Sequence, residues 1–219
     1  MSLVLYSHPF AMYCWKPLVA LYERGVTFEA VLVEDRAELA ELWPPASIPV
    51  LIEDGAVIPE SSSIVEYLDR HGDAQPMLPT DPERALRARI WDRVIDGYVA
   101  TPVQKIVGDA LRPAGAKDPQ GVDQAQAALD LAYATLERQL DGRGASGGWL
   151  AGEDFTLADC SAAPALHYAD VLHALDRGTH PALGAYYDRL LERPSVARVI
   201  DEARPLRHFF PLPWPAHVV

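Results

Sequence analysis

The stretch SIPVLIEDGAVIPESSSIVEYL, residues 47–68, contains the strongest local signals in this chain of 219 residues. The dipeptide Asp54-Gly55 separates two apolar runs, a pattern typical of a tight β-hairpin because both turn residues tolerate positive φ. It predicts strands over residues 49–53 and 56–58. A serine run follows, and because serine favours helix N-termini we expect a helix from Ser61.

Four residues at the ends of this hairpin have the chemistry of a binding site. Pro49 has no N–H for a sheet ladder and so belongs at the start of its strand, which keeps the backbone of Ile48 extended. Glu60 and Ser61 stand at a helix start, where free N–H groups attract anions. Together these groups suit a small ligand that carries amide, ammonium and carboxylate groups.

The segments before the hairpin alternate between strand and helix patterns. Apolar runs predict strands over 3–6 and 27–33, and periodic apolar residues predict helices over 13–24 and 38–43. We expect Pro17 in the first turn of its helix, because a proline further inside removes a backbone hydrogen bond. Strand, helix and strand in this order predict a right-handed parallel unit. The complete order is βαβαββα.

Beyond residue 82 the patterns are helical. The segment 71–82 is rich in Pro, Gly and Asp and predicts an interdomain linker. Apolar residues at four-residue spacing predict a long amphipathic helix, with Leu86, Ile90, Val94 and Tyr98 on one stripe. The predicted helices are 83–107, 122–140, one from Phe155, 182–192 and 195–203, with loops at 111–121 and 142–148 and an irregular tail from Pro205.

The helix expected near Phe155 has a recognisable start. Thr156 and Asp159 have the spacing of a capping box, in which each side chain bonds to the backbone of the other residue. The preceding segment, 149–152, reads WLAG. This box fixes where the helix begins more firmly than periodicity does elsewhere in the helical half.

The capping box and the pairs Ile48-Pro49 and Glu60-Ser61 resemble the cytosolic glutathione transferases. The resemblance implies an α/β N-terminal thioredoxin-like domain over 1–75, an all-α C-terminal helical domain over 83–219, and a homodimer. It also implies glutathione as co-substrate. In that family a cis-proline follows a residue whose backbone pairs with the cysteinyl part of glutathione, and a Glu/Gln-Ser pair holds the γ-glutamyl end.

The activity that the resemblance implies is the attack of a glutathione thiolate on a small electrophilic, apolar molecule. Family members place a hydroxyl or thiol at the start of the first helix, where it stabilises the thiolate. In this chain the corresponding segment, 8–16, reads HPFAMYCWK and puts Ala11 at that position. Alanine donates no side-chain hydrogen bond, so the usual catalytic group is missing.

Three nearby residues are candidates for the missing role. Tyr13 carries a phenol that can donate to a thiolate, and Ser7 would need the loop to fold back. Cys14 could form a mixed disulfide with glutathione, which would make the protein a thiol transferase or isomerase instead. Tyr13 and Cys14 also suit plain burial in a helix. A catalytically weak binder of glutathione or apolar ligands is a further alternative.

The remaining site residues follow from the same resemblance. Phe10 belongs to the expected glutathione-binding set with Ile48, Pro49, Glu60 and Ser61. The family's acceptor pocket lies between the domains and is lined by apolar residues. Its candidates here are Phe10, Met12, Trp91 and Tyr98, with Phe209 and Phe210 from the tail. Trp91 and Tyr98 fit a helical core at least as well.

Composition excludes several other classes. The formal charge of −12, from 19 basic and 31 acidic residues, argues against a nucleic-acid partner. No apolar run reaches the length of a membrane span, and the first residues lack the pattern of a signal peptide. Two distant cysteines suggest no disulfide framework, so we expect a cytoplasmic protein. No His, Cys or acidic spacing predicts a metal site.

Overall fold

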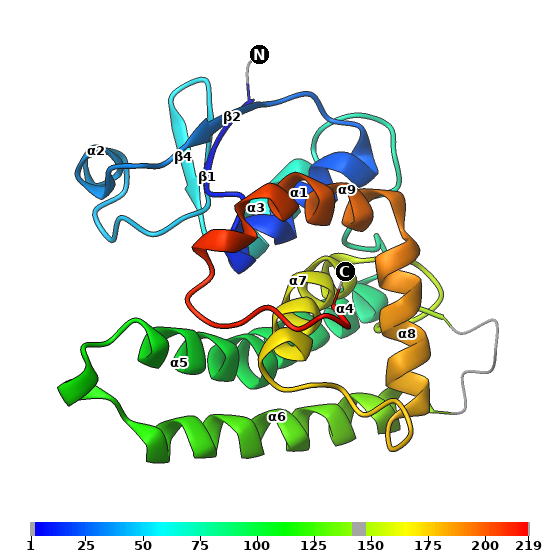
Figure 1. Ribbon diagram of the computed structural model, residues 1–219. Coiled ribbons are helices and arrows are strands. Elements are labelled where there is room, and N and C mark those ends of the chain that lie inside the picture. The colour runs from blue at the N-terminus through cyan, green and yellow to red at the C-terminus, as the bar shows by residue number, and fades with distance from the viewer. Residues whose placement is uncertain (1–2, 142–147, 219) are drawn as a thin grey trace.

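The computed structural model describes residues 3–141 and 148–218, and it has an α/β unit next to a helical unit (Figure 1). The strands form one sheet in the order β2-β1-β3-β4, with β1 parallel to β2 and antiparallel to β3. In chain order the elements are β1 (Leu3–Ser7), α1 (Met12–Arg24), β2 (Glu29–Leu32), α2 (Arg36–Leu42), β3 (Val50–Glu53), β4 (Ala56–Pro59) and α3 (Ser61–Leu68). The predicted order βαβαββα is confirmed.

The hairpin of β3 and β4 forms as the sequence predicts. Asp54 and Gly55 both have positive φ, 46° and 83°, and the strands pair from Glu53 with Ala56 outward. The peptide bond between Ile48 and Pro49 is cis, as the family resemblance implies. Because Val50 pairs with Pro59, the hairpin brings Ile48 and the start of α3 to the same end of the sheet.

Helix α1 differs from its predicted form in one respect. It begins at Met12, so Pro17 is its sixth residue and lies inside the helix rather than in the first turn. Proline cannot donate to the carbonyl four residues back, which is that of Tyr13. The helix continues because one face packs against α3, α7 and α9, and its residues from Cys14 to Leu21 are all buried.

The helical unit is arranged around α7, whose residues from Leu157 to Val171 are all buried. The predicted capping box of Thr156 and Asp159 is present at its start. Helix α7 packs against α1 and α4, and so joins the two units (Figure 1). The helices are α4 (Pro82–Ile95), η1 (Asp96–Ala100), α5 (Thr101–Ala110), η2 (Ala114–Ala116), α6 (Pro119–Leu140), α7 (Leu157–Leu172), α8 (Pro181–Glu192), α9 (Pro194–Ala203) and η3 (Arg204–Phe209).

The long helix predicted over 83–107 is helical throughout but is oriented differently from our expectation. One π-helical turn, η1, interrupts it at Asp96–Ala100 and separates α4 from α5. The apolar stripe faces outward, and Leu86, Ile90 and Tyr98 are 52%, 48% and 61% exposed. The buried face consists of Ala85, Ala88, Asp92, Ile95 and Val99. Small residues on this face allow α4 to approach α7 closely.

The last part of the chain folds back onto the helices. After η3 the tail crosses α7, where Trp214 contacts the rings of His167 and Tyr168 (Figure 1). Val218 is buried, and its carbonyl accepts from the Trp214 indole. Within the described residues no helix has the length and apolar character needed to cross a membrane. The predicted loop 142–148 lies, except for Gly148, outside the described residues.

Candidate functional site

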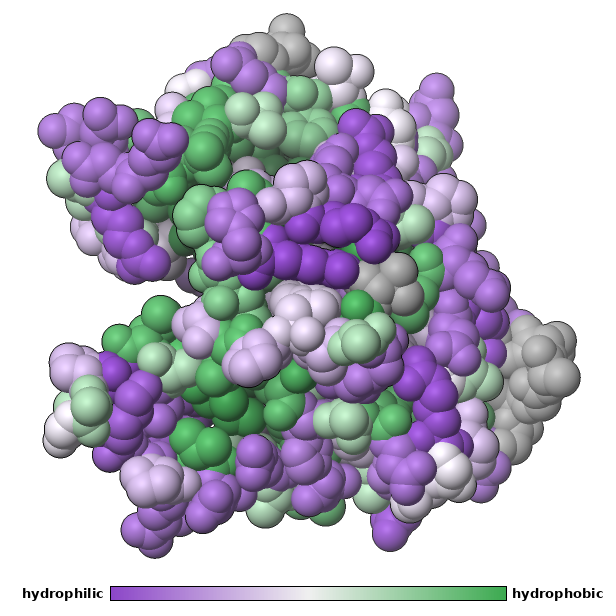
Figure 2. Space-filling view, viewed as in Figure 1, coloured by the Kyte–Doolittle hydropathy of each residue, from purple (hydrophilic) through white to green (hydrophobic). Residues whose placement is uncertain are grey.

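A deep cleft separates the α/β unit from α4, η1 and α5, and its volume is about 1380 Å³. Figure 2 shows it as an indentation between the upper and lower halves of the molecule. The α/β wall contains the starts of α1 and α3, and the opposite wall contains the residues around η1. Among the lining residues are His8, Phe10, Ala11, Met12, Tyr13, Arg36, Ile48, Pro49, Glu60, Ser61, Asp96, Thr101, Gln104, Tyr168, Phe209 and Phe210.

The start of α3 brings together four of the residues that the sequence singled out. Ile48, Pro49, Glu60 and Ser61 all line the cleft. Glu60 rather than a serine is the N-cap, and its φ of 68° is unusual for a residue with a side chain. This conformation turns the chain from β4 into α3. It leaves the first amides of α3 without a side-chain cap.

The Ser61 side chain is available to a ligand. It is 7% exposed, lines the cleft, and makes no hydrogen bond within the described residues. Beside it, Ser62 accepts hydrogen bonds from Lys16 and Arg93 and donates to Asp92. The two neighbouring hydroxyls therefore differ in role, because Ser62 joins α3 to the helical unit while Ser61 faces the cleft.

Lys16 belongs to a buried ionic cluster that the sequence did not indicate. Its ammonium lies 2.9 Å from a carboxylate oxygen of Asp92 and 2.9 Å from one of Asp96, and the residue is 1% exposed. Burial would raise the pKa of Asp92, but Lys16 and hydrogen bonds from Ser161, Lys16 and Arg93 lower it below its usual range. For Asp96 burial outweighs Lys16, and its pKa is raised. This cluster holds α1 against α4 beneath the cleft.

The start of α1 has no side chain that could act as a cap. Ala11 is the N-cap, in an extended conformation, and the amides of Met12 and Tyr13 have no acceptor within the helix. Ala11, Met12 and Tyr13 all line the cleft. The partial positive charge of the helix start is therefore directed at the cleft, next to the position where the family has a hydroxyl.

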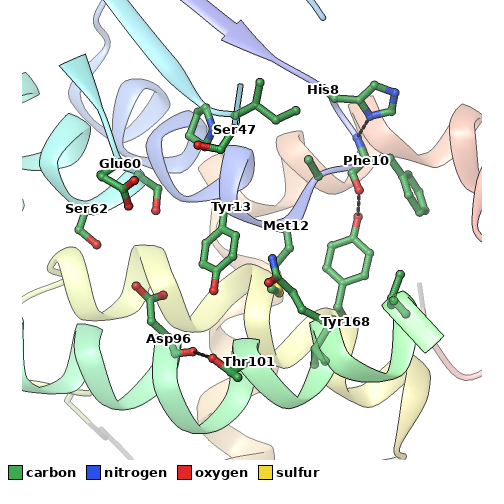
Figure 3. Close-up of a pocket in the computed structure, with 18 of the residues that line it drawn as sticks. His8, Phe10, Met12, Tyr13, Ser47, Glu60, Ser62, Asp96, Thr101 and Tyr168 are labelled. Carbon is green, nitrogen blue, oxygen red and sulfur yellow. Dashed lines mark hydrogen bonds between the residues drawn. The ribbon is translucent and has the colours of Figure 1, made fainter. Parts of the chain in front are cut away.

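Tyr13 is the one candidate catalytic residue that lines the cleft, within the part of the chain described. Its ring extends from α1 toward Asp96 on the opposite wall (Figure 3). Burial, and secondarily the charge of Asp96, raise the pKa of the phenol to about 12. Tyr13 therefore stays protonated at neutral pH and can donate a hydrogen bond.

The other two catalytic candidates, Cys14 and Ser7, do not line the cleft. Cys14 is fully buried, and burial raises the pKa of its thiol to about 12, so it is neither ionised nor accessible at neutral pH. Ser7 is 6% exposed at the end of β1, on the face of the sheet that packs on the core. Neither residue lines the cleft, so the geometry does not support a catalytic role for Cys14 or Ser7.

The acceptor side of the cleft is only partly as expected. Met12, Phe10 and the tail residues Phe209 and Phe210 line it, together with apolar residues of α5 that the sequence did not single out. Trp91 and Tyr98 do not line it, which corrects their assignment to the pocket. Trp91 packs partly buried against the core, and Tyr98 points outward on η1.

Tyr168 and Arg36 also line the cleft without having been predicted. Tyr168 comes from the middle of α7, and its hydroxyl donates to the carbonyl of Phe10 (Figure 3). Arg36 is an exposed cation at the start of α2, and within residues 3–141 and 148–218 it forms no ion pair. No cluster of His, Cys, Asp or Glu in that same part of the chain has the geometry of a metal site.

Comparison with known proteins assigns both halves of the chain to one family. Residues 5–76 match the N-terminal domain model of glutathione S-transferases, and residues 119–189 match the C-terminal domain model. A glutathione S-transferase-like protein of Fusarium sp, LUC7, is 31% identical over 167 residues, which cover 74% of each chain. This chain belongs to the glutathione S-transferase family.

Two further relatives match over nearly their whole length. A probable maleylacetoacetate isomerase of Caenorhabditis elegans is 27% identical over 92% of this chain and 94% of its own. The crystal structure of a glutathione S-transferase from Methylobacillus flagellatus KT, with GSH (glutathione) bound, superposes with a TM-score of 0.82 at 27% identity. That match covers 90% of this chain and 98% of the other.

Proposed function

We propose that this protein is a glutathione transferase that joins the glutathione thiol to a small apolar electrophile. The proposal rests on one observation, that three features line the same cleft. They are the cis Ile48-Pro49 pair, the uncapped start of α3 at Ser61 and the uncapped start of α1. The relative of known structure from Methylobacillus flagellatus supports glutathione as the ligand.

In this proposal each part of glutathione is assigned to one of these elements. The backbone of Ile48 pairs with the cysteinyl part, and Ser61 with the amides of α3 holds the γ-glutamyl carboxylate. Glu60 stands beside them to accept from the ammonium group. The sulfur then lies near the start of α1, where the amides of Met12 and Tyr13 stabilise its anion.

The reaction proceeds from the thiolate. The S–H bond breaks, the proton goes to solvent, and the sulfur electron pair forms a C–S bond with the acceptor. In a substitution, the pair of the broken bond leaves with the leaving group. The apolar wall of Met12, Phe10 and the tail residues Phe209 and Phe210 holds the acceptor and orients it toward the sulfur.

An isomerase function is the second candidate, because one relative is named a probable maleylacetoacetate isomerase. The same thiolate would add to a conjugated double bond, the former π pair would move toward the carbonyl, and rotation would precede release of the thiolate. This route needs no side-chain thiol. The version of this idea that uses Cys14 is not supported, because Cys14 is fully buried.

The experiment that tests the function is a titration of glutathione into the protein, with thiolate absorbance followed against pH. Binding with a thiol pKa at least about one unit below that of free glutathione, or about 1.4 kcal/mol of preferential thiolate stabilisation, is expected for a transferase. Binding with an unshifted pKa would identify a weak or inactive binder. Absence of binding would reject the proposal.

We further propose that the protein is a homodimer that pairs through the outward stripe of α4 and η1. Leu86, Ile90 and Tyr98 form an exposed apolar row there, which a second copy would cover.

Ile90→Glu should convert the dimer to a monomer in light scattering, because it buries a charge in the interface. Leu131→Glu, at an exposed leucine on α6, is the control and should leave the mass unchanged. A monomeric wild-type protein would contradict the proposal.

A further inference from the structure

The loop between β1 and α1, residues 8–11, is held by hydrogen bonds from within the loop and from α1. The carbonyl of Pro9 accepts from the indole of Trp15 at 2.7 Å, and the amide of Phe10 donates to Nδ1 of His8 at 3.1 Å. The amide of Ala11 donates to the carbonyl of His8 at 2.9 Å. These three bonds restrain the conformation of a segment that, as a surface connection, would otherwise be more mobile.

The peptide plane between Phe10 and Ala11 is fixed at both of its ends. Its carbonyl accepts from the Tyr168 hydroxyl at 3.1 Å, and its N–H is the Ala11 amide that bonds to His8. Because a peptide unit is rigid, these two bonds set the direction in which the chain enters α1. They thereby also set where the amides of Met12 and Tyr13 point.

The Tyr168 hydroxyl is suited to a permanent contact of this kind. The residue is 3% exposed, and burial raises its pKa well above the ordinary value for a phenol. It remains a donor over the whole pH range in which a thiol titrates. It reaches the loop from α7, the most buried helix of the protein, so its position is defined by the core.

The side chain of Phe10 is enclosed by three aromatic rings. Its centroid lies 5.8 Å from that of Tyr168, 5.6 Å from Phe210 and 5.8 Å from Trp214. Such contacts contribute beyond the buried area alone. Two of the three rings belong to the C-terminal tail, so the tail holds the same loop that Tyr168 holds.

We propose that Tyr168 is a positioning residue for ionisation of the glutathione thiol, acting through its hydrogen bond to Phe10 and through the ring enclosure shared with Phe210 and Trp214. The inference rests on the proposed function, since it concerns the thiol bound there. Tyr168 does not touch the sulfur. It holds the start of α1 in place, so that the amides of Met12 and Tyr13 already point at the sulfur. When the S–H proton leaves for solvent, the sulfur keeps the electron pair and these amides do not have to reorient.

The test is Tyr168→Phe, which removes the hydroxyl and keeps the ring. The pKa of bound glutathione, followed by thiolate absorbance, should rise by about half a unit, so that about threefold less thiolate is present below that pKa. The affinity for glutathione, measured by calorimetry at low pH where the thiol is protonated, should stay within about twofold, because the contacts at Ile48 and α3 are unchanged.

Tyr133→Phe is the matched control. The Tyr133 hydroxyl is also buried and also donates to a backbone carbonyl, that of His173 at 2.8 Å, but it lies outside the cleft. Its loss should lower stability to a similar degree and leave the thiol pKa unchanged. A role of Tyr168 in stability alone would make the two variants behave alike.

A second variant keeps the proposal testable if Tyr168→Phe does not fold. Phe210→Leu removes one ring of the enclosure at a half-buried position and should raise the thiol pKa in the same direction by a smaller amount. An unchanged thiol pKa in the variant that folds would overturn the proposal. If wild-type protein binds no glutathione, the proposed function fails instead, so the two failures are distinguishable.

Discussion

Two helix starts, those of α1 and α3, lie on the α/β wall of the cleft, and they differ in which of the family's residues they contain. Helix α3 begins with the Glu60-Ser61 pair that the family uses, whereas α1 begins with Ala11 where the family has a hydroxyl or thiol. Neither start is capped by a side chain. The comparison indicates that glutathione binding depends on the start of α3 and thiol activation on the start of α1. One of the two can therefore be lost without the other.

Several other helices carry a side-chain cap, although α8 and α9 also begin without one. Helices α2, α4 and α6 begin after Asp35, Asp81 and Asp118, and each carboxylate accepts a backbone N–H of its helix. Capping of this kind stabilises a helix by about 1 kcal/mol. At the cleft the corresponding amides of α1 and α3 are left for a ligand, which fits an anionic sulfur and an anionic carboxylate.

The largest effect is expected at α3. Ser61→Ala removes a hydroxyl that makes no hydrogen bond within the described residues and is therefore available to the γ-glutamyl carboxylate. A hydrogen bond to a charged group contributes about 1.5–3 kcal/mol. The dissociation constant of glutathione in calorimetry should accordingly rise about 10- to 100-fold.

Ser63→Ala is the control for this change. It removes the same group from the same first turn of α3, at an exposed position. Ser63 also lines the cleft, but its side chain is exposed and we assign it no ligand contact, so we expect the dissociation constant to change by less than about twofold. Equal effects of the two substitutions would show that helix stability, and not the ligand contact, is being measured.

The sequence predicted the α3 side of this comparison well, because its signals are local. Asp54-Gly55 and Pro49, in the hairpin that leads into α3, each determine the conformation of their own neighbourhood, and both features are present. The capping box of Thr156 and Asp159 does the same at the start of α7. The stripe of Leu86, Ile90 and Tyr98 has helical spacing, but spacing alone does not say whether the stripe faces the core or the outside. In this protein the small residues on the opposite face are buried instead.

The α1 side could not be predicted in the same way. The bond from Tyr168 to Phe10 joins residues 158 positions apart, and the Lys16 cluster joins α1 to η1 across 80 positions. No local pattern marks either partner, because Tyr168 is one residue among many in a helix that is buried along nearly its whole length. Cys14 is likewise buried because α1 packs against the core. The sequence was compatible with both a buried and a catalytic Cys14 and could not distinguish them.

A smaller effect is expected when the missing hydroxyl is returned to α1. Ala11→Ser places a donor at the N-cap, next to the expected position of the sulfur, and should lower the pKa of bound glutathione by about one further unit. Because serine also caps the helix, the free energy of unfolding in urea should rise by about 1 kcal/mol. A gain in stability without a change in thiol pKa would show that the sulfur does not lie at the start of α1.

The smallest effect is expected from Tyr13→Phe, which serves as the counterpart of Ala11→Ser. The phenol extends toward Asp96, and burial together with that carboxylate raises its pKa to about 12 (Figure 3). A thiolate at the phenol would lie close to the charge of Asp96, which disfavours it, whereas the amides at the start of α1 carry partial positive charge. The pKa of bound glutathione should therefore change by less than about 0.3 unit on loss of the hydroxyl, which corresponds to about 0.4 kcal/mol. A rise of one unit or more would instead identify Tyr13 as the group that replaces the missing hydroxyl, and α1 would then use a side chain after all.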